Sequence, residues 1–227
     1  MFSKKIKIIA VFKSSPTWIA KYVYILKKSF EKHLTIPHEF ICLSDCQLDC
    51  KTIPLGNLHG VNSGDHIPEF WYKPQIFKPE NKLNENCLYC DLDTIIRGNL
   101  DHLVCQIKDH NFLMSADPWK DNVSSSCLMW WNGDYSYLWD KFKTKGVSEW
   151  SSIYSKKDLS KYGDQGFISD NVKHDRIQNV IENKFNITRI RKKESGSDAK
   201  ILFCSGRRKP WDQLEHPEVA KHWKNVL

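Results

Sequence analysis

No apolar run in the sequence approaches the roughly 20 residues that cross a bilayer as a helix, and the best one, residues 6–12, has the length of a strand. The basic residues near the N-terminus are not followed by a long apolar segment and a small-residue cleavage site, as they are in a secretory signal. We therefore expect no transmembrane segment and a cytoplasmic protein with no anchor of its own.

Internal repeats, low-complexity tracts and linker-like stretches are also missing from the 227 residues. A chain of this length can bury one continuous core, so we expect a single domain over residues 1–227. Hydrophobic residues make up 41% and charged residues 27%, which is the balance of a soluble globular protein.

Eight cysteines occur, and without a secretory signal we expect free thiols rather than disulfides. Cys87 and Cys90 have the C-x-x-C spacing found in many zinc sites. They fall in a predicted strand, however, where residues three apart point to opposite faces. The spacing therefore disfavours a zinc site.

Positive charge is concentrated in one part of the chain, whose formal net charge is +7. Residues 184–209 contain nine Lys or Arg and only two acidic residues. Such a segment suits an anionic ligand, either a nucleotide diphosphate or a nucleic-acid backbone. A solvated positive face is the alternative.

The hydrophobic pattern predicts an α/β fold. Strand, helix and strand follow one another over residues 5–12, 18–33 and 38–43, which is how a parallel sheet begins. Further strands are predicted over 86–96, 112–116 and 200–204, with an apolar run over 126–131, a helix over 135–143 and a helix start or turn over 164–171. We expect a mostly parallel central sheet flanked by helices.

Two carboxylates follow the apolar residues 87–90 of a predicted strand, at Asp91 and Asp93. Residues two apart share a face of a strand, and a turn at its end can bring both carboxylates to one cation. Carboxylate oxygens suit Mn²⁺ or Mg²⁺ bridging to phosphate, and open α/β sheets bind ligands at the carboxyl ends of strands. The alternative is a pair of surface carboxylates that cap a turn.

A carboxylate and an amide, Asp164 and Gln165, stand between Gly163 and Gly166. A general base or a group that stabilises a transition state needs such a side chain on a backbone that can approach the substrate closely. Capping of a helix by Asp164 is the competing interpretation.

Flexible backbone, three cations and an aromatic ring combine in residues 206–211, Gly-Arg-Arg-Lys-Pro-Trp. A diphosphate leaving group gains negative charge as its bond to a sugar breaks, and cations aimed at it lower the barrier. An exposed basic turn is the alternative.

The order of these motifs resembles that of the glycosyltransferases of the GT-A fold. It is similar to family eight, the galactosyltransferase and glycogenin group, and looks closer still to a poorly characterised set of bacterial and viral proteins with that fold. The resemblance rests on residues 9–12, 22–45, 70–77, 88–100, 126–133, 163–165 and 206–211, which span nearly the whole chain.

This resemblance implies roles for residues around a nucleotide. Asp91 and Asp93 would hold the Mn²⁺ or Mg²⁺ ion that bridges the donor diphosphate, and Gly206 and Lys209 would clamp that diphosphate. Phe12, at the end of the first strand, would lie by the base.

It also implies roles around the transferred sugar. Lys73 occupies the position of a basic residue near the donor. Asp117 and Ser126 would face the sugar, and Asp164 and Gln165 would lie beside its anomeric carbon.

One departure from the family concerns a histidine that serves as a third metal ligand. Phe203 occupies its position in family eight, and Ser205 its position in the closer set. Three consequences are open: weak metal binding, water as the missing ligand, or greater reliance on Arg207, Arg208 and Lys209.

The function implied is transfer of a sugar from a nucleoside diphosphate donor, uridine-based, to a hydroxyl of a glycan or other acceptor, with no nucleic-acid partner. Retention and inversion at the anomeric carbon are both open. A non-catalytic carbohydrate- or nucleic-acid-binding module (a pseudoenzyme) is the first alternative. A nucleotidyltransferase is less favoured, because residues 13–16 are not a glycine-rich phosphate loop.

Overall fold

The computed structural model describes residues 5–16, 18–58, 67–117, 123–155, 161–182, 187–189, 199–204 and 209–224. The strands are β1 (Ile6–Phe12), β2 (His38–Ser44), β3 (Lys51–Pro54), β4 (Cys87–Cys90), β5 (Thr94–Ile96), β6 (Phe112–Ala116), β7 (Ser124–Trp131), β8 (Asp175–Arg176), β9 (Ile187–Arg189) and β10 (Ile201–Phe203). The α-helices are α1 (Lys21–His33), α2 (Asp101–Ile107), α3 (Ser136–Lys143), α4 (Val147–Ile153), α5 (Gly163–Asn171), α6 (Ile177–Val180) and α7 (Pro217–His222), and the 3₁₀ helices are η1 (Glu69–Phe77), η2 (Pro79–Asn81) and η4 (Pro210–Asp212).

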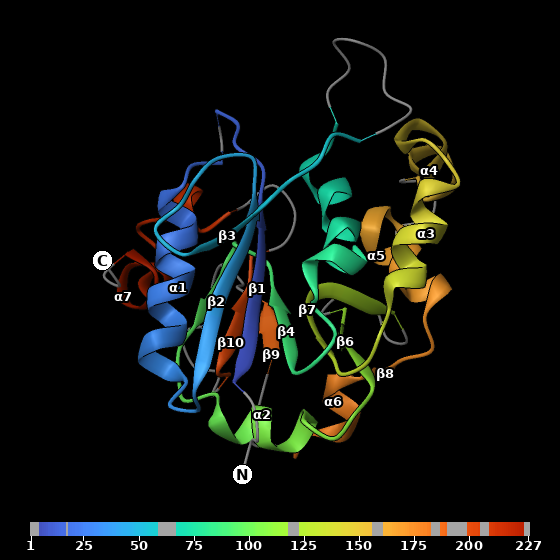
Figure 1. Cartoon of the computed structure of the whole chain (residues 1–227). Coiled ribbons are helices and arrows are strands. Elements are labelled where there is room, and N and C mark those ends of the chain that lie inside the picture. The colour runs from blue at the N-terminus through green and yellow to red at the C-terminus, as the bar shows by residue number, and fades with distance from the viewer. Residues whose placement is uncertain are drawn as a thin grey trace.

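A seven-stranded sheet runs through the centre in the order β3-β2-β1-β4-β7-β6-β8. β1 pairs in parallel with β2 and β4, β2 with β3, and β6 with β8, whereas β7 is antiparallel to both of its neighbours. Helix α1 covers one side of this sheet, and η1, α3, α4 and α5 lie on the other (Figure 1). The predicted α/β fold, a mostly parallel central sheet flanked by helices, is confirmed.

Strand alternation divides the core into one cluster on each face of the sheet. Along β4, Leu88 and Cys90 pack with the cluster on one face, and Cys87 and Tyr89 with the cluster on the other. All four side chains are nearly inaccessible to solvent, as expected for a central strand covered on both faces. The expectation that Cys87 and Cys90 point to opposite faces is therefore confirmed.

A second sheet, in the order β5-β10-β9, corrects one prediction. Residues 86–96 do not form one strand: β4 ends at Cys90, the chain turns through Asp91–Asp93, and β5 joins the second sheet. The prediction was wrong because apolar residues dominate on both sides of Asp91–Asp93, and periodicity does not show where a chain leaves one sheet for another. The turn puts both acidic residues between the two sheets.

Two other predicted boundaries shift. The first helix begins at Lys21 rather than at residue 18, and the helix around Asp164 begins at Gly163. The candidate cap Thr17 lies outside the described residues. No helix in the described ranges is both long enough and apolar enough to cross a membrane.

Substitution of Trp131 tests the packing on the face of the central sheet that η1 covers. The Trp131 ring is fully buried, and its Nε1–H donates a hydrogen bond to the backbone carbonyl of Leu83 at 2.7 Å. Trp131→Phe removes the donor and leaves a void, so we expect a loss of about 2 kcal/mol in unfolding free energy. Urea denaturation followed by circular dichroism measures it.

Trp139→Phe on α3 is the matched control, because Trp139 is only partly buried and packs at the margin of the same cluster. We expect a change within about 0.5 kcal/mol. Equal losses in the two variants would contradict the assigned role of Trp131.

Candidate functional site

The turn after β4 fixes two carboxylates at the carboxyl end of that strand. The Asp91 N–H donates to the carbonyl of Cys127 on β7 at 2.9 Å, and the Thr94 N–H donates to the Asp91 carbonyl at 3.2 Å. Between the acidic residues, the Leu92 side chain is 2% exposed and packs in the core. Asp91 and Asp93 are thereby held on either side of an anchored residue.

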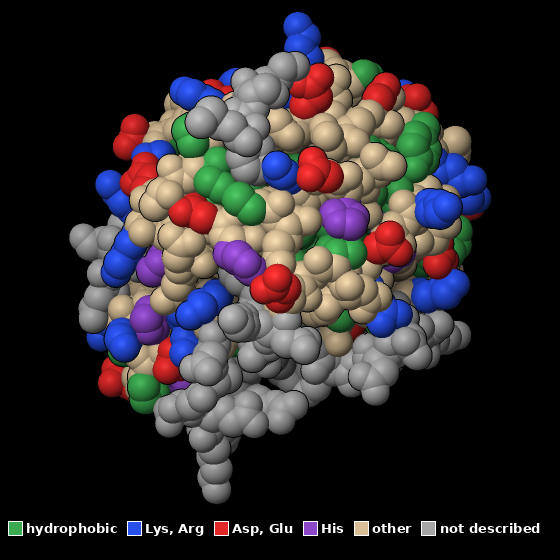
Figure 2. Space-filling view, turned by 90° about the horizontal axis from the view of Figure 1, so that it is seen from below, with side chains coloured by type: hydrophobic (Ala, Val, Ile, Leu, Met, Phe, Trp, Pro, Cys, Tyr) green, Lys and Arg blue, Asp and Glu red, His purple; other side chains and the backbone are tan. Residues whose placement is uncertain are grey.

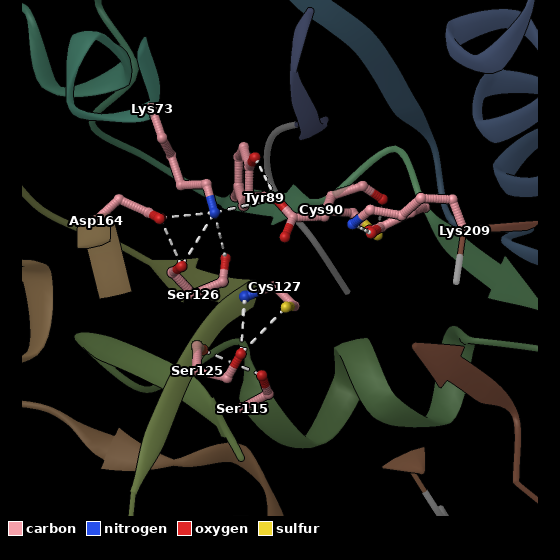
Figure 3. A network of polar contacts seen from close by, with 11 residues as sticks. Lys73, Tyr89, Cys90, Ser115, Ser125, Ser126, Cys127, Asp164 and Lys209 are labelled. Carbon is pink, nitrogen blue, oxygen red and sulfur yellow. Dashed lines mark hydrogen bonds and ion pairs between the residues drawn. The ribbon is translucent and has the colours of Figure 1, made fainter. Parts of the chain in front are cut away.

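A buried ammonium group joins four elements of the fold. Lys73 Nζ, on η1, lies 3.0 Å from Asp91 Oδ1 and 2.7 Å from Asp164 Oδ2. It also donates to Ser126 Oγ at 3.0 Å, and the Ser126 hydroxyl donates to Asp164 Oδ2 at 2.6 Å. Figure 3 shows Lys73 reaching between Asp164 and Ser126. Four of the predicted site residues therefore meet in one network.

Lys73 is held in its charged form. Burial by itself lowers the pKa of an ammonium group, but the carboxylates of Asp164 and then Asp91 raise the pKa of Lys73 well above its ordinary value. The side chain is only 5% exposed. A buried charge persists only when it is paired and hydrogen-bonded, and here two carboxylates and a hydroxyl do this.

Tyr89 also belongs to the network, although the sequence analysis did not single it out. Its hydroxyl donates to Asp91 Oδ1 at 2.6 Å, and Lys73 Nζ lies 4.9 Å from its ring centroid. Burial, and then the negative charge of Asp91, raise the pKa of Tyr89 well above its ordinary value, so it is a hydrogen-bond donor. Strand alternation could have found it, because residues two apart share a face.

A bulge places Ser126. The pairing of β6 with β7 shifts register between Met114, which pairs with Met129, and Ser115, which pairs with Ser125. Residues 126–128 of β7 therefore have no partner on β6. Bulges bend a strand and redirect its side chains. The Ser126 hydroxyl thereby reaches Lys73 on a different element.

Asp164 lies in the first turn of α5, but it does not cap that helix. The N-cap is Tyr162 and makes no side-chain cap hydrogen bond, so the capping interpretation of Asp164 is wrong. Gly163 has φ +63°, and a Cβ there would lie 2.8 Å from the Phe70 ring. A Cβ on Gly166 would lie 2.0 Å from the Lys161 carbonyl. Both glycines are needed for this close approach.

A second ion pair lies beside the first. The Lys209 ammonium contacts Asp93 Oδ2, and their side chains are 25% and 9% exposed. Burial raises the pKa of the Asp93 carboxyl, Lys209 partly offsets this, and the negative charge of Asp91 raises it further. For Lys209, burial lowers the pKa, but Asp93 outweighs it and the net shift is upward.

The small sheet returns the C-terminal segment to this turn. β10 is antiparallel to β5, and the Cys204 N–H donates to the Asp93 carbonyl at 3.4 Å. Trp211 then stacks on Tyr22 of α1, with ring centroids 3.9 Å apart and planes 5° apart. Trp18, which the sequence analysis also missed, lies with its ring centroid 5.6 Å from Lys209 Nζ.

The remaining predicted residues are placed less directly. Phe12 ends β1, but its ring is 1% exposed and packs in the core. Asp117 follows β6, and its backbone N–H donates a hydrogen bond to the carbonyl of Val123. Gln165 is half-buried beside Asp164 on α5. Gly206 lies outside the described residues. The roles of these residues stay predictions.

The charges of the site leave room for a cation. Three carboxylates and two ammonium groups of the described residues meet here, at Asp91, Asp93, Asp164, Lys73 and Lys209, so one negative charge is in excess. The oxygens of Asp91 and Asp93 are hard ligands, which suit Mg²⁺ or Mn²⁺ completed by water and phosphate. This donor set fits such an ion.

A third protein ligand is not evident among the described residues, where no group of three or more His, Cys, Asp or Glu could hold a metal. Phe203, at the family's histidine position, is 1% exposed and packs in the core. Ser205 lies outside the described ranges. The three consequences left open by the sequence therefore stay predictions.

The opposite end of the molecule, near the start of β1, has a different character. Figure 2 shows Lys, Arg, Asp and Glu side chains interspersed over this face. A surface that follows a nucleic-acid backbone collects positive charge, whereas the coloured residues of this face mix both signs.

Comparison with solved structures finds the same fold in glycosyltransferases. The galactosyltransferase LgtC, in complex with donor and acceptor sugar analogues, matches with a TM-score of 0.58 and 12% identity over 97% of this chain and 95% of LgtC. The glycosyltransferase GlyE of Streptococcus pneumoniae TIGR4 matches with a TM-score of 0.57 and 11% identity over 98% of this chain and 63% of GlyE. An active-site mutant of LgtC gives a TM-score of 0.58.

No protein-family model and no curated protein sequence matches the chain. At 11–12% identity the structural likeness establishes the fold alone. The expected fold of the GT-A type is thus supported by solved glycosyltransferases, whereas membership of family eight stays a prediction.

Lys73→Met tests the central ion pair. The change leaves two carboxylates without their ammonium partner, so we expect the unfolding free energy to fall by about 3 kcal/mol. Combining it with Asp164→Asn should recover part of the loss, with a coupling above about 1 kcal/mol. Urea denaturation of the two single variants and the double variant measures the cycle.

Lys27→Met is the matched control, because the half-buried Lys27 pairs with the exposed Glu31 one turn along α1 at 2.8 Å. Pairs of this kind within one helix contribute about 0.5 kcal/mol or less. A loss for Lys73→Met no greater than the loss for the control would show that the buried pair does not hold the site together.

Proposed function

We propose that the protein is a glycosyltransferase that moves a sugar from a nucleoside diphosphate donor, uridine-based, to an acceptor hydroxyl, with a divalent cation. The observation that carries the proposal is the network of Lys73, Asp91, Asp164 and Ser126 at the carboxyl end of β4. Open α/β sheets bind ligands at that edge, and the fold is shared with LgtC and GlyE.

Asp91 and Asp93 would hold the cation. A bound Mn²⁺ or Mg²⁺ would neutralise the charge that develops on the departing diphosphate. Lys209 would add a second positive charge on the same side, because it already lies against Asp93. These residues act on the leaving group, where charge develops in the transition state.

Asp164 and Gln165 would act on the sugar. Lys73 and Ser126 fix the carboxylate of Asp164 through Oδ2, so it would present a preorganised oxygen to the donor sugar or to the acceptor hydroxyl. Both stereochemical outcomes agree with this placement, and the anomeric configuration of the product, measured by NMR, distinguishes them.

Binding of uridine diphosphate tests the nucleotide site. Isothermal titration should show binding that depends on Mn²⁺, and Asp93→Ala should weaken it at least about tenfold, because a cation ligand is removed. Asp140→Ala is the matched control: Asp140 is exposed on α3 and pairs with Lys143.

Two results of that titration would count against the proposal. One is binding of uridine diphosphate that needs neither Mn²⁺ nor Asp93. The other is binding of oligonucleotides with a steep salt dependence and no need for Asp93, which favours a nucleic-acid-binding module instead.

Donor hydrolysis tests the chemistry. In a panel of sugar nucleotides with Mn²⁺ present, at least one donor should be hydrolysed to its nucleoside diphosphate and free sugar. Asp164→Asn should slow that hydrolysis roughly a hundredfold, because the carboxylate that would face the donor sugar loses its negative charge. Its affinity for uridine diphosphate should change little.

The matched control is Asp170→Asn on the same helix, where the exposed Asp170 pairs with Lys161. Hydrolysis by this variant should equal that of the wild type. Donor turnover by Asp164→Asn at the wild-type rate would exclude Asp164 from the chemistry.

A further inference from the structure

Lys209 already pairs with Asp93, one of the two carboxylates that would hold the cation. Its ammonium contacts Asp93 Oδ2, and the field of Asp91 also acts on it. Asp91, for its part, is engaged by Lys73 and Tyr89 through Oδ1. In the free chain, the two carboxylates therefore neutralise two different ammonium groups.

A divalent ion and the Lys209 ammonium compete for Asp93. Like charges at contact distance repel strongly in a partly buried site, and Asp93 is only 9% exposed. A cation can bind Asp93 only if Lys209 moves away, and leaving the ammonium without a partner is costly where water is scarce. Entry of the cation thus requires a new anionic partner for Lys209.

We infer that Lys209 transfers from Asp93 to the donor diphosphate when the donor binds, so that cation and diphosphate bind cooperatively. This inference rests on the proposed function, because it takes the diphosphate as the anion that enters with the cation. Lys209 would keep Asp93 neutralised in the free chain and release it only when both ligands are present.

The local structure allows the side chain to move while the backbone stays. The Lys209 N–H donates to Asp212 Oδ2 at 3.3 Å, and η4 follows directly. Trp211 is stacked on Tyr22, which anchors the segment to α1. Among the described residues, the ammonium itself makes one ion pair, with Asp93, and it lies 5.6 Å from the Trp18 ring centroid. A lysine on a four-carbon stem can change partner by rotamer rotation alone.

Titration of Mn²⁺ into the nucleotide-free protein tests the inference, with loss of the electron paramagnetic resonance signal of aqueous Mn²⁺ as the readout. Lys209→Met removes the competing charge, so we expect its Mn²⁺ affinity without nucleotide to exceed that of the wild type by roughly five- to fiftyfold, which lies within the usual range of coupling between sites. Lys209→Arg, which keeps the charge, should bind Mn²⁺ as weakly as the wild type.

The reciprocal measurement uses uridine diphosphate. Coupling between two ligands is equal in both directions, so Mn²⁺ should strengthen binding of uridine diphosphate less in Lys209→Met than in the wild type, as measured by isothermal titration. Lys27→Met, which removes a lysine paired with Glu31 on α1, should leave both affinities unchanged.

The outcomes separate the inference from the proposal beneath it. The inference alone is overturned if the wild type binds Mn²⁺ together with uridine diphosphate but Lys209→Met does not raise the Mn²⁺ affinity of the nucleotide-free protein. Wild type that fails to bind Mn²⁺ even with uridine diphosphate overturns both. Near-ultraviolet circular dichroism of Lys209→Met must match the wild type, which shows that the packing of Trp211 is intact.

Discussion

The ammonium group of Lys73 is the constraint on which the geometry of the site depends. It is 5% exposed, and its carboxylate partners Asp91 and Asp164 come from the turn after β4 and from α5. A charge buried this deeply is stable only if every partner stays within reach. Three segments must therefore keep fixed positions relative to one another: the end of β4, the bulge that carries Ser126, and the start of α5.

The two lysines of the site differ in how they are held. Lys73 is fixed by two carboxylates and a hydroxyl. Lys209 pairs with one carboxylate of the described residues and lies near an aromatic ring, and its side chain is 25% exposed. Lys73 has a structural role, because its contacts fix the positions of the surrounding site residues. Lys209 lies at the margin of the site, on a segment that aromatic stacking anchors to α1, where a change of partner disturbs little of the core.

Sequence patterns could predict the elements that depend on local periodicity. The first strand, the helix after it and the second strand were found because their apolar spacing is regular over many residues. The separation of β4 from β5 was not found, because both are apolar. The contact between Lys73 and Asp164 was also beyond reach: as a helix cap Asp164 satisfied every local rule, and only the tertiary fold brings the lysine to it.

The surplus of negative charge argues that this cluster was not selected for stability alone. One carboxylate for each lysine would complete the ion pairs, yet among the described residues Asp91, Asp93 and Asp164 contact two ammonium groups. Burial raises the pKa of Asp93, so ionisation of Asp93 destabilises the fold as the pH rises through that pKa. A carboxylate that weakens the free chain at neutral pH is understandable if a positively charged ligand completes the site. Residues at functional sites commonly violate the rules that stabilise the rest of a protein.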